Sequence, residues 1–250
     1  MTPRTTTVAV LLASALSLNS SGVFCQEPVA VTDNDKWPRP LLVVAPSFPK
    51  GASTEMLPVQ IRVEGAVTAD GNFRSPAFIP TEGREAFVRA ISDVLPYWRF
   101  RPALDRKTCK TAESPAVFGV TFELKAGAPS VSVSSPAAEK VDGAGTPLRG
   151  LHLVSTHGAK FPYEARQGAI EGFAEILVAI DSEGDIERKS IISSIPNALF
   201  GDAALEGLRH ARFSRPDMSQ SDFKTVCFVL PFNFCLSPGE ARYPDSHCRK

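Results

Sequence analysis

Histidine and cysteine are common metal ligands and catalytic residues, so their spacing is a first indication of whether the protein is an enzyme. His152 and His157 are five residues apart, which suits zinc ligation on neither a helix nor a strand, and the other histidines are His210 and His247. The sequence contains no G-x-S-x-G motif, no P-loop and no H-E-x-x-H motif. We therefore expect a protein without catalytic residues, metal or cofactor.

The acidic stretch DSEGD, residues 181–185, has the composition of a calcium-binding loop. It also fits a hairpin turn, in which Gly184 adopts the positive φ that the turn requires. A similar stretch, TADG at residues 68–71, lacks most of these carboxylates. The comparison favours a hairpin turn at both places.

The N-terminus has the pattern of a signal peptide. Arg4 supplies a positive charge, and the apolar run Val8–Leu18 follows it. This run is too short to cross a bilayer, which takes about 20 apolar residues. The residues up to Cys25 offer a cleavage site, so we expect residues 1–25 to be removed and the mature chain to begin near Gln26 without a transmembrane anchor. An uncleaved anchor and a buried N-terminal helix are the alternatives.

Four cysteines remain after the expected cleavage, an even number that favours disulfides in an oxidising compartment. Cys227 and Cys235 stand in what reads as one strand, about 26 Å apart at ~3.3 Å per residue, whereas a disulfide spans roughly 7 Å. The polar C-terminal tail is long enough to fold back, so we expect Cys235–Cys248, which leaves Cys109–Cys227. Metal binding by these cysteines is a weaker alternative, because no C-x-x-C spacing occurs.

The stretch YWRFRPA, residues 97–103, interleaves aromatic and basic side chains that could stack bases and pair with phosphates. The alternative is the end of an amphipathic helix, with buried rings and solvated arginines. The chain has 27 Lys and Arg and 27 Asp and Glu, a formal net charge of zero, and nucleic-acid binding depends mainly on clustered positive charge. We therefore expect Trp98 and Phe100 in the core, Arg99 in solvent, and no nucleic-acid partner.

The second half of the chain repeats the first at an offset of 113 residues. HARFSRP, residues 210–216, repeats the Arg-Phe pair of YWRFRPA but replaces Tyr97 and Trp98 with His210 and Ala211, which removes the aromatic platform. The same ungapped alignment matches Gly71 with Gly184, Phe73 with Ile186, Val63 with Ile176, Val67 with Ile180, and FPKGA at 48–52 with FPYEA at 161–165. The sequence therefore predicts a tandem duplication.

Each copy is expected to be an α+β unit of the order β-β-α-β. The strand-like segments VQIRVEGAV and FAEILVAI each lead through a Gly-containing turn into a return strand. An amphipathic helix follows, with apolar residues at spacings of four, four and three: Phe87, Ile91, Leu95 and Trp98 in the first copy, Phe200, Ala204, Leu208 and Ala211 in the second. A last strand completes a three-stranded antiparallel sheet, and the helix packs on one of its faces.

The predicted boundaries follow from this order. The first copy spans residues 40–125 and the second residues 149–237. Residues 126–148, rich in Gly, Ala, Ser and Pro, are expected to form a flexible linker, and residues 238–250 a tail.

These motifs, in this order, resemble the C-terminal domain of TonB. The second copy carries Phe161-Pro162, Ala165, Ile170-Glu171-Gly172, Asp181 and Gly184, and the first carries YWRFRPA but lacks the IEG. The resemblance implies a periplasmic binding domain that presents a strand edge to a short peptide, the TonB box of an outer-membrane receptor, in TonB-dependent transport. The family's transducer keeps an uncleaved membrane helix, whereas we expect this N-terminus to be cleaved, and the chain lacks the family's long Pro-rich spacer, so the resemblance supports binding and not force transduction.

The docking surface is expected on the last strand, because a three-stranded sheet leaves an edge whose backbone groups can pair with a peptide. Pairing should stop before Pro231, which has no N–H to donate. The expected binding residues are Val226, Cys227, Phe228 and Val229 of this strand, together with Phe161 and Pro162. The alternative function is a structural envelope protein in which the two copies pack as a pseudo-dimer. An open edge would favour peptide capture, and a buried edge a structural role.

Overall fold

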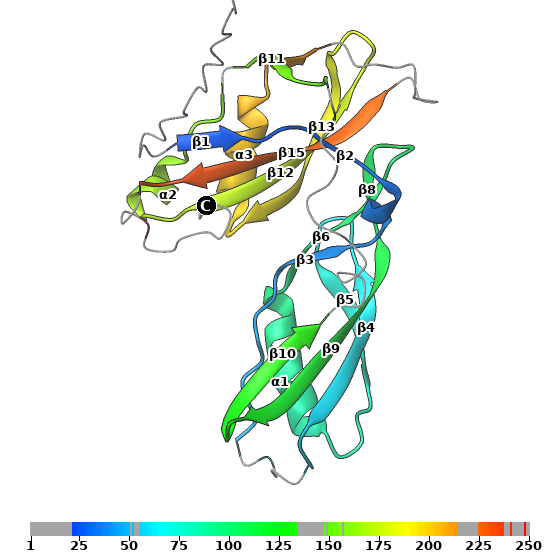
Figure 1. Ribbon diagram of the computed structural model, residues 1–250. Helices are drawn as coiled ribbons and strands as arrows, with labels where there is room; N and C mark the ends of the chain where they lie inside the picture. The colour runs from blue at the N-terminus through cyan, green and yellow to red at the C-terminus, as the bar shows by residue number, and fades with distance from the viewer. Residues whose placement is uncertain are drawn as a thin grey trace, which may run out of the picture.

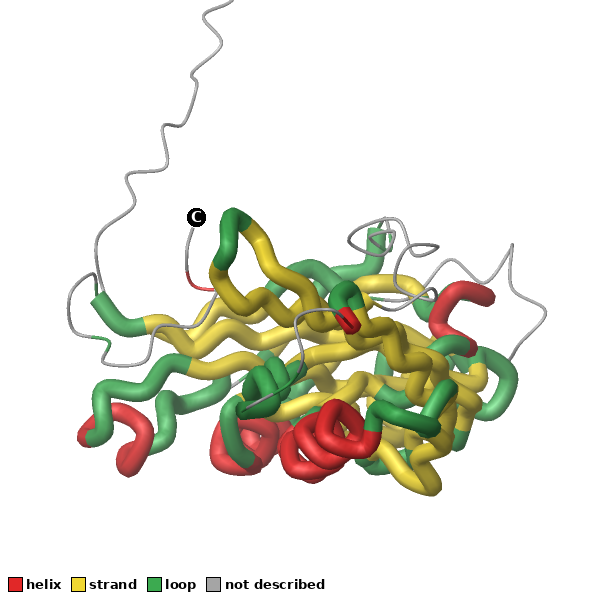
Figure 2. The backbone as a smooth tube through the Cα atoms, turned by 90° about the horizontal axis from the view of Figure 1, so that it is seen from below, coloured by secondary structure: helices red, strands yellow, loops and turns green. Residues whose placement is uncertain are grey.

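Two α+β units form the body of the protein in its computed structural model, one above the other in Figure 1. Seen from below in Figure 2, the longer helices of both units lie on the same side of the strands. No helix in the part of the chain that the structure describes is long and apolar enough to cross a membrane. The described residues are 22–50, 52, 56–134, 148, 150–156, 158–214, 225–237, 241 and 248.

The first unit contains a sheet in the strand order β10-β9-β4-β5. β4 (Val59–Val67) and β5 (Phe73–Ile79) form a hairpin, α1 (Glu85–Val94) follows, and β9 (Ser114–Lys125) pairs antiparallel with β4. β10 (Ala128–Ser134) then turns back along β9. Buried and exposed residues alternate along the first half of β4, because one face of the sheet packs on α1 and the other faces solvent.

The second unit has the same order of elements. β12 (Gly172–Ile180) and β13 (Ile186–Ile195) form a hairpin, α3 (Ala198–Gly207) follows, and β15 (Val226–Cys235) pairs antiparallel with β12. Unlike β4, β12 is buried on both faces, with Glu175 alone half-buried. The reason is that α3 covers one face of this sheet and part of the first unit covers the other.

The N-terminal segment runs across both units. β1 (Gly22–Cys25) and β2 (Val29–Ala30) pair with β15, so the second sheet has the order β1-β15-β12-β13 with β2 also on β15. The chain continues through a 3-10 turn, η1 (Asp33–Lys36), into β3 (Arg39–Leu42), which pairs with β6 (Arg99–Arg101) of the first unit. Figure 1 shows this blue segment beside β15 and then descending to the lower unit.

Equivalent positions of the two units make the same contacts. Gly71 and Gly184 both have a positive φ, and their carbonyls accept hydrogen bonds of 3.0 Å from the N–H groups of Phe100 and Phe213. A Cβ on either glycine would lie 2.1 or 2.2 Å from the carbonyl oxygen of that same phenylalanine. α1 and α3 also begin and end 113 residues apart. These contacts agree with the predicted alignment, while a duplication in ancestry stays a prediction.

The predicted helix stripes are buried, and all eight of their residues lie in the two main cores. Trp98 is fully buried, and its Nε1 donates to the carbonyl of Val44 at 2.9 Å. Arg99 is exposed and donates to the carbonyl of Pro96 at 2.7 Å. α1 ends before this stretch, and the 3-10 turn η3 (Leu95–Tyr97) with Pro96 near its start carries the stripe on to Trp98.

Several predicted boundaries are wrong or lie outside the described residues. The sheets are not three-stranded, because β10 extends the first and β1 and β2 extend the second. Residues 128–134 of the predicted linker (126–148) form β10, since Val131 and Val133 pack against the first core. Residues 1–21 of the expected signal peptide, and most of the predicted tail (238–250), lie outside the described residues.

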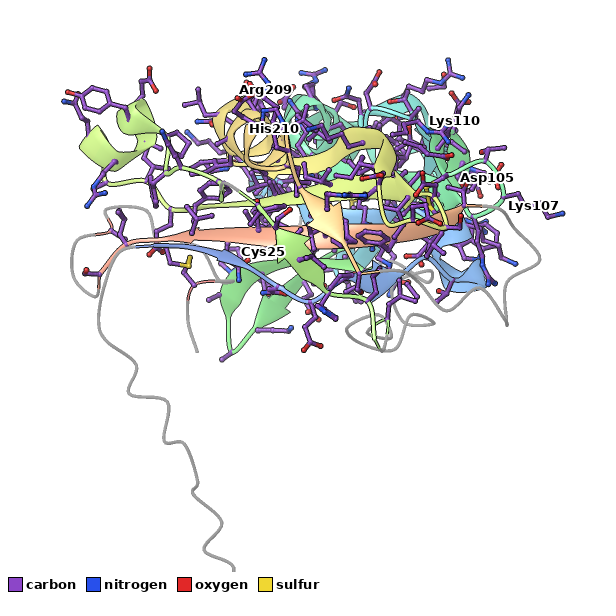
Figure 3. The ribbon with its side chains drawn as sticks, turned by 90° about the horizontal axis from the view of Figure 1, so that it is seen from above. Cys25, Asp105, Lys107, Lys110, Arg209 and His210 are labelled. Atoms are coloured by element: carbon purple, nitrogen blue, oxygen red, sulfur yellow. A yellow bond between two sulfur atoms is a disulfide. The ribbon has the colours of Figure 1, made fainter. Side chains whose placement is uncertain are left out.

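The units are joined by a hairpin of the first unit that covers the helix-free face of the second sheet. β7 (Ala103–Asp105) and β8 (Lys110–Ala112) form this hairpin, and Asp105, Lys107 and Lys110 stand at one end of β15 in Figure 3. Leu104 and Cys109 of this hairpin form a third buried cluster with Val31 of the N-terminal segment and with residues of the second sheet: Leu177, Ala179, Ile192 and Val229. The two units therefore pack hairpin against sheet face, not edge to edge.

Candidate peptide-binding edge

The outer edge of β15, where we expected a peptide to dock, is occupied by the chain's own N-terminal segment. β12 pairs along one side of β15. On the other side Phe228 and Val229 pair with β2, and Phe232–Cys235 pair with β1. The prediction of an open edge is therefore wrong at Phe228 and Val229, two of the four residues expected to pair with a peptide. The prediction assumes a sheet of three strands. The strands that close the edge come from about 200 residues earlier in the chain, so the sequence around β15 does not indicate them.

Pro231 divides this outer edge into two parts. Its carbonyl accepts a hydrogen bond of 3.0 Å from the N–H of Gln26, and it has no N–H to donate in return. β2 pairs with β15 before Pro231, and β1 pairs with it afterwards. The interruption predicted at Pro231 is present, but strand pairing resumes on its far side at Phe232–Cys235.

Phe161 lies beside the C-terminal part of β15. Its ring meets those of Phe200 and Phe234 edge-on, with centroid distances of 6.2 and 6.0 Å. The predicted pairing segment Val226–Val229 ends five residues before Phe234, roughly 16 Å away along an extended strand. The structure therefore brings Phe161 to Phe232–Cys235 and not to the segment predicted to bind with it.

Pro162 begins the short helix α2 (Tyr163–Gln167) at this end of the sheet. Its carbonyl accepts a hydrogen bond of 2.9 Å from the N–H of Arg166. Tyr163, the next residue, is 70% exposed. An exposed aromatic side chain thus lies two residues after Phe161 in the chain, and aromatic residues are enriched in the buried parts of protein interfaces.

Glu171 and Gly172 of the IEG motif fix the end of β15. The buried carboxylate of Glu171 accepts a hydrogen bond of 2.9 Å from the N–H of Leu236, the residue that follows the strand. A Cβ on Gly172 would lie 2.4 Å from the ring of Phe200, so this position needs glycine for the helix to approach the sheet. The motif therefore positions the segment that pairs with β1.

Two disulfides hold the ends of β15, in the pairing expected from the sequence. Cys109–Cys227 joins the hairpin of the first unit to the start of the strand, and Cys235–Cys248 joins its last residue to the C-terminal tail. Cys227 therefore has its side chain engaged across the two units. Both bonds restrict the position of β15 without using its outer backbone groups.

A cleft of about 460 Å³ lies beside β1, with Cys25 and Leu151 among the residues that line it. Cys25, labelled in Figure 3, is the free cysteine of the described residues. Although the residue as a whole is exposed, burial of its thiol against the cleft raises the thiol's pKa to about 11. A protonated thiol is a weak nucleophile. The cleft does not hold an activated cysteine.

The DSEGD stretch is a turn held by its own backbone. Oδ1 of Asp181 accepts hydrogen bonds from the N–H groups of Glu183 and Asp185 at 2.9 and 3.0 Å, and the Asp185 carboxylate pairs with Arg212 at 2.7 Å. Within the described ranges, no cluster of three or more His, Cys, Asp or Glu side chains is placed to hold a metal. His157 and His247 lie outside those ranges.

Residues 158–236 match the family described as Gram-negative bacterial TonB protein C-terminal. The matched segment is the second unit, from just before Phe161 to just after β15. A solution structure of the Pseudomonas aeruginosa TonB C-terminal domain is 22% identical, with a TM-score of 0.30, and the alignment covers 35% of this chain and 88% of that chain. No curated protein matches this chain.

The family match covers one of the two copies that the sequence predicted. The IEG motif, the Phe161-Pro162 pair and β15 all lie inside the matched residues, whereas the first unit, with its YWRFRPA motif, lies outside them. The second unit is therefore similar to TonB C-terminal domains. For the first unit, a similarity to TonB C-terminal domains is supported only by its order of elements and by the predicted alignment of the two copies.

Arg101 is the residue of this region that sequence reasoning missed. We considered the arginines of YWRFRPA as solvated, but Arg101 is buried between the units, 3.3 Å from Asp35 and 3.5 Å from Glu175 of β12. Asp35 also pairs with Arg39 at 3.0 Å, and burial together with the charge of Arg101 lowers the pKa of Arg39. These four charges link the N-terminal segment, the first unit and the second sheet.

Proposed function

We propose that the protein is an exported, TonB C-terminal-like binding protein of the cell envelope, with a binding and not a catalytic role. Its partner is a peptide segment, such as the TonB box of an outer-membrane receptor, which pairs with the outer edge of β15 in TonB-dependent transport. The family match of the second unit supports the class of protein. The predicted signal peptide supports the compartment, the periplasm.

One observation carries the proposal: a short antiparallel strand already lies on the edge at Phe232–Cys235. An edge strand offers a row of unpaired N–H and C=O groups, and a peptide that adds a strand there satisfies them. Phe161 packs on Phe234 of this stretch, and the exposed Tyr163 lies two residues later in the chain. This refines the predicted site from Val226–Val229 to the stretch beyond Pro231.

The second unit is the better candidate because the equivalent edge of the first unit is closed. β10 pairs with β9 over seven positions, from Ala128 opposite Lys125 to Ser134 opposite Gly119. It is connected to β9 by a two-residue turn, so a peptide in solution would compete with a covalently attached strand. β1 covers four positions of β15 and leaves with residues 1–25 if the predicted cleavage occurs.

The test is a titration of the isotopically labelled chain beginning at Gln26 with receptor TonB-box peptides, with backbone amide shifts as the readout. We expect saturable shifts at Phe232–Cys235 and none along β9. A matched peptide with proline at its central position is the control, because proline cannot donate to the ladder. Shifts that do not saturate, or that fall outside the second unit, would contradict the proposal.

A structural envelope protein, with the two units packed as an internal pseudo-dimer, is the second candidate. Two observations favour it: β1 and β2 occupy the outer edge of β15, and the units share a buried contact with an apolar cluster, ion pairs and the Cys109–Cys227 disulfide. In that case no receptor peptide should bind the chain beginning at Gln26. The same titration separates the two functions.

A further inference from the structure

We propose that β1 is an internal ligand of the β15 edge: Gly22–Cys25 closes the peptide site in the unprocessed chain, and its own residues show which peptides the open site accepts. This inference rests on the proposed function, because it concerns the regulation and the specificity of the same edge. It adds two claims, that removal of the leader opens the site and that an aliphatic side chain opposite Phe234 is the specificity determinant.

The register of β1 gives the direction of the peptide. Gly22 stands opposite Cys235, Val23 opposite Phe234 and Cys25 opposite Phe232, so the strand is antiparallel to β15. Val23 is half-buried and packs against the core beneath α3. A peptide that replaces β1 should therefore run antiparallel and present an aliphatic side chain at the position of Val23.

The position of Val23 excludes a charged residue. It contacts a cluster of aliphatic and aromatic side chains, and a carboxylate placed there would lose its hydration without gaining a partner. Opposite Cys235 stands Gly22, next to the Cys235–Cys248 disulfide. The cleft that borders Cys25 leaves room for a larger side chain two positions after the aliphatic one. The accepted peptide thus has an aliphatic residue at the position of Val23, and its side chain two residues later can vary in size.

The end of β1 coincides with the predicted cleavage site. Cleavage before Gln26 removes all four residues of β1 and leaves β2, whose two pairs with Phe228 and Val229 lie on the other side of Pro231. The opened part of the edge is then Phe232–Cys235, the part beside Phe161. An attached strand acts at a high effective concentration, so the uncleaved chain should bind external peptides weakly.

The experiment adds a synthetic peptide of residues 22–27, with Cys25 replaced by serine, to the chain beginning at Gln26. We expect saturable amide shifts at Phe232–Cys235, and a loss of affinity of about tenfold or more when the peptide carries Val23→Asp, since burying an unpaired carboxylate costs more than 1.4 kcal/mol. A peptide with Val23→Ile is the matched control and should bind like the parent. No saturable binding, or equal binding of the Asp and Ile peptides, would overturn the inference.

A second arm compares chains beginning at Gly22 and at Gln26, titrated with the same receptor peptide. The longer chain should bind it at least about tenfold more weakly, because its own strand competes within the molecule. Val23→Asp in the longer chain should restore binding by loosening β1. If both chains bind the receptor peptide equally, the inference fails and the proposed function stands. If the 22–27 peptide binds and no receptor peptide does, β1 is still shown to be a ligand of this edge, and the proposed function fails.

Discussion

Trp98 and Arg99 are adjacent residues with opposite environments. Trp98→Ala should lower the free energy of unfolding by about 3–5 kcal/mol, because it empties a fully buried site and leaves the carbonyl of Val44 without its donor. Arg99→Ala, the matched control, should change it by about 0.5 kcal/mol or less, since Arg99 is exposed. Urea denaturation of both variants measures this. Equal losses would show that the inward-facing residue has been misassigned.

Gly71 and Gly184 test whether the two units share one turn geometry. Gly71→Ala and Gly184→Ala should each cost more than about 2 kcal/mol, because the new Cβ would meet a backbone oxygen at a positive φ. Gly83→Ala is the control: Gly83 also has a positive φ, but a Cβ there meets nothing within 4 Å. Thermal unfolding of the three variants compares them. If Gly83→Ala destabilises the protein as much as the other two substitutions, the contact with the phenylalanine carbonyl oxygen is not the cause of the loss.

At the residue scale, the sequence predicted contacts that arise within one unit. The stripes from Phe87 to Trp98 and from Phe200 to Ala211 follow from helical periodicity, which a local segment already contains. Arg101 could not be predicted in the same way. It stands two residues from the exposed Arg99, and its burial is caused by Asp35 and Glu175, which come from other elements.

At the scale of elements, the two disulfides should contribute differently to stability. Cys109–Cys227 encloses 118 residues and Cys235–Cys248 encloses 13. Loop-closure entropy then gives about 5 and about 3 kcal/mol respectively, so replacing both cysteines of the longer loop by alanine should be the more destabilising change. Chemical denaturation of the two double variants tests this order. If the Cys235/Cys248 variant loses more stability, local packing around the disulfides, and not the entropy of the unfolded chain, determines their contributions.

The hairpins, helices and last strands could be predicted because their turn residues and apolar periods are local. The strands that complete the sheets could not. β10 lies in a stretch whose Gly, Ala, Ser and Pro content suggested a linker, and Val131 and Val133 were too weak a signal against that composition. β1 and β2 pair with a strand about 200 residues away, so no neighbouring sequence indicates where they lie.

At the scale of the whole molecule, the four charges between the units should matter as a group. Arg101→Ala removes the cation that pairs with the buried carboxylates of Asp35 and Glu175. We therefore expect the free energy of unfolding to fall by about 3 kcal/mol or more, and the contact between the units to weaken. Arg62→Ala is the control, because Arg62 pairs with Glu64 on the exposed face of β4 and should cost about 1 kcal/mol or less. Differential scanning calorimetry should show the Arg101 variant unfolding in two steps. A single transition at unchanged temperature would show that these ion pairs do not join the units.

Binding at the edge of β15 is the central claim, and paramagnetic relaxation of the chain beginning at Gln26 tests it most directly. The receptor peptide carries a nitroxide at its N-terminus in one sample and at its C-terminus in the other. In antiparallel register, the N-terminal label should broaden the amide of Cys235 most and the C-terminal label that of Phe232, as the register of β1 indicates. Strongest broadening on the opposite edge strand, β13, or no broadening on β15 with either label, would contradict the account.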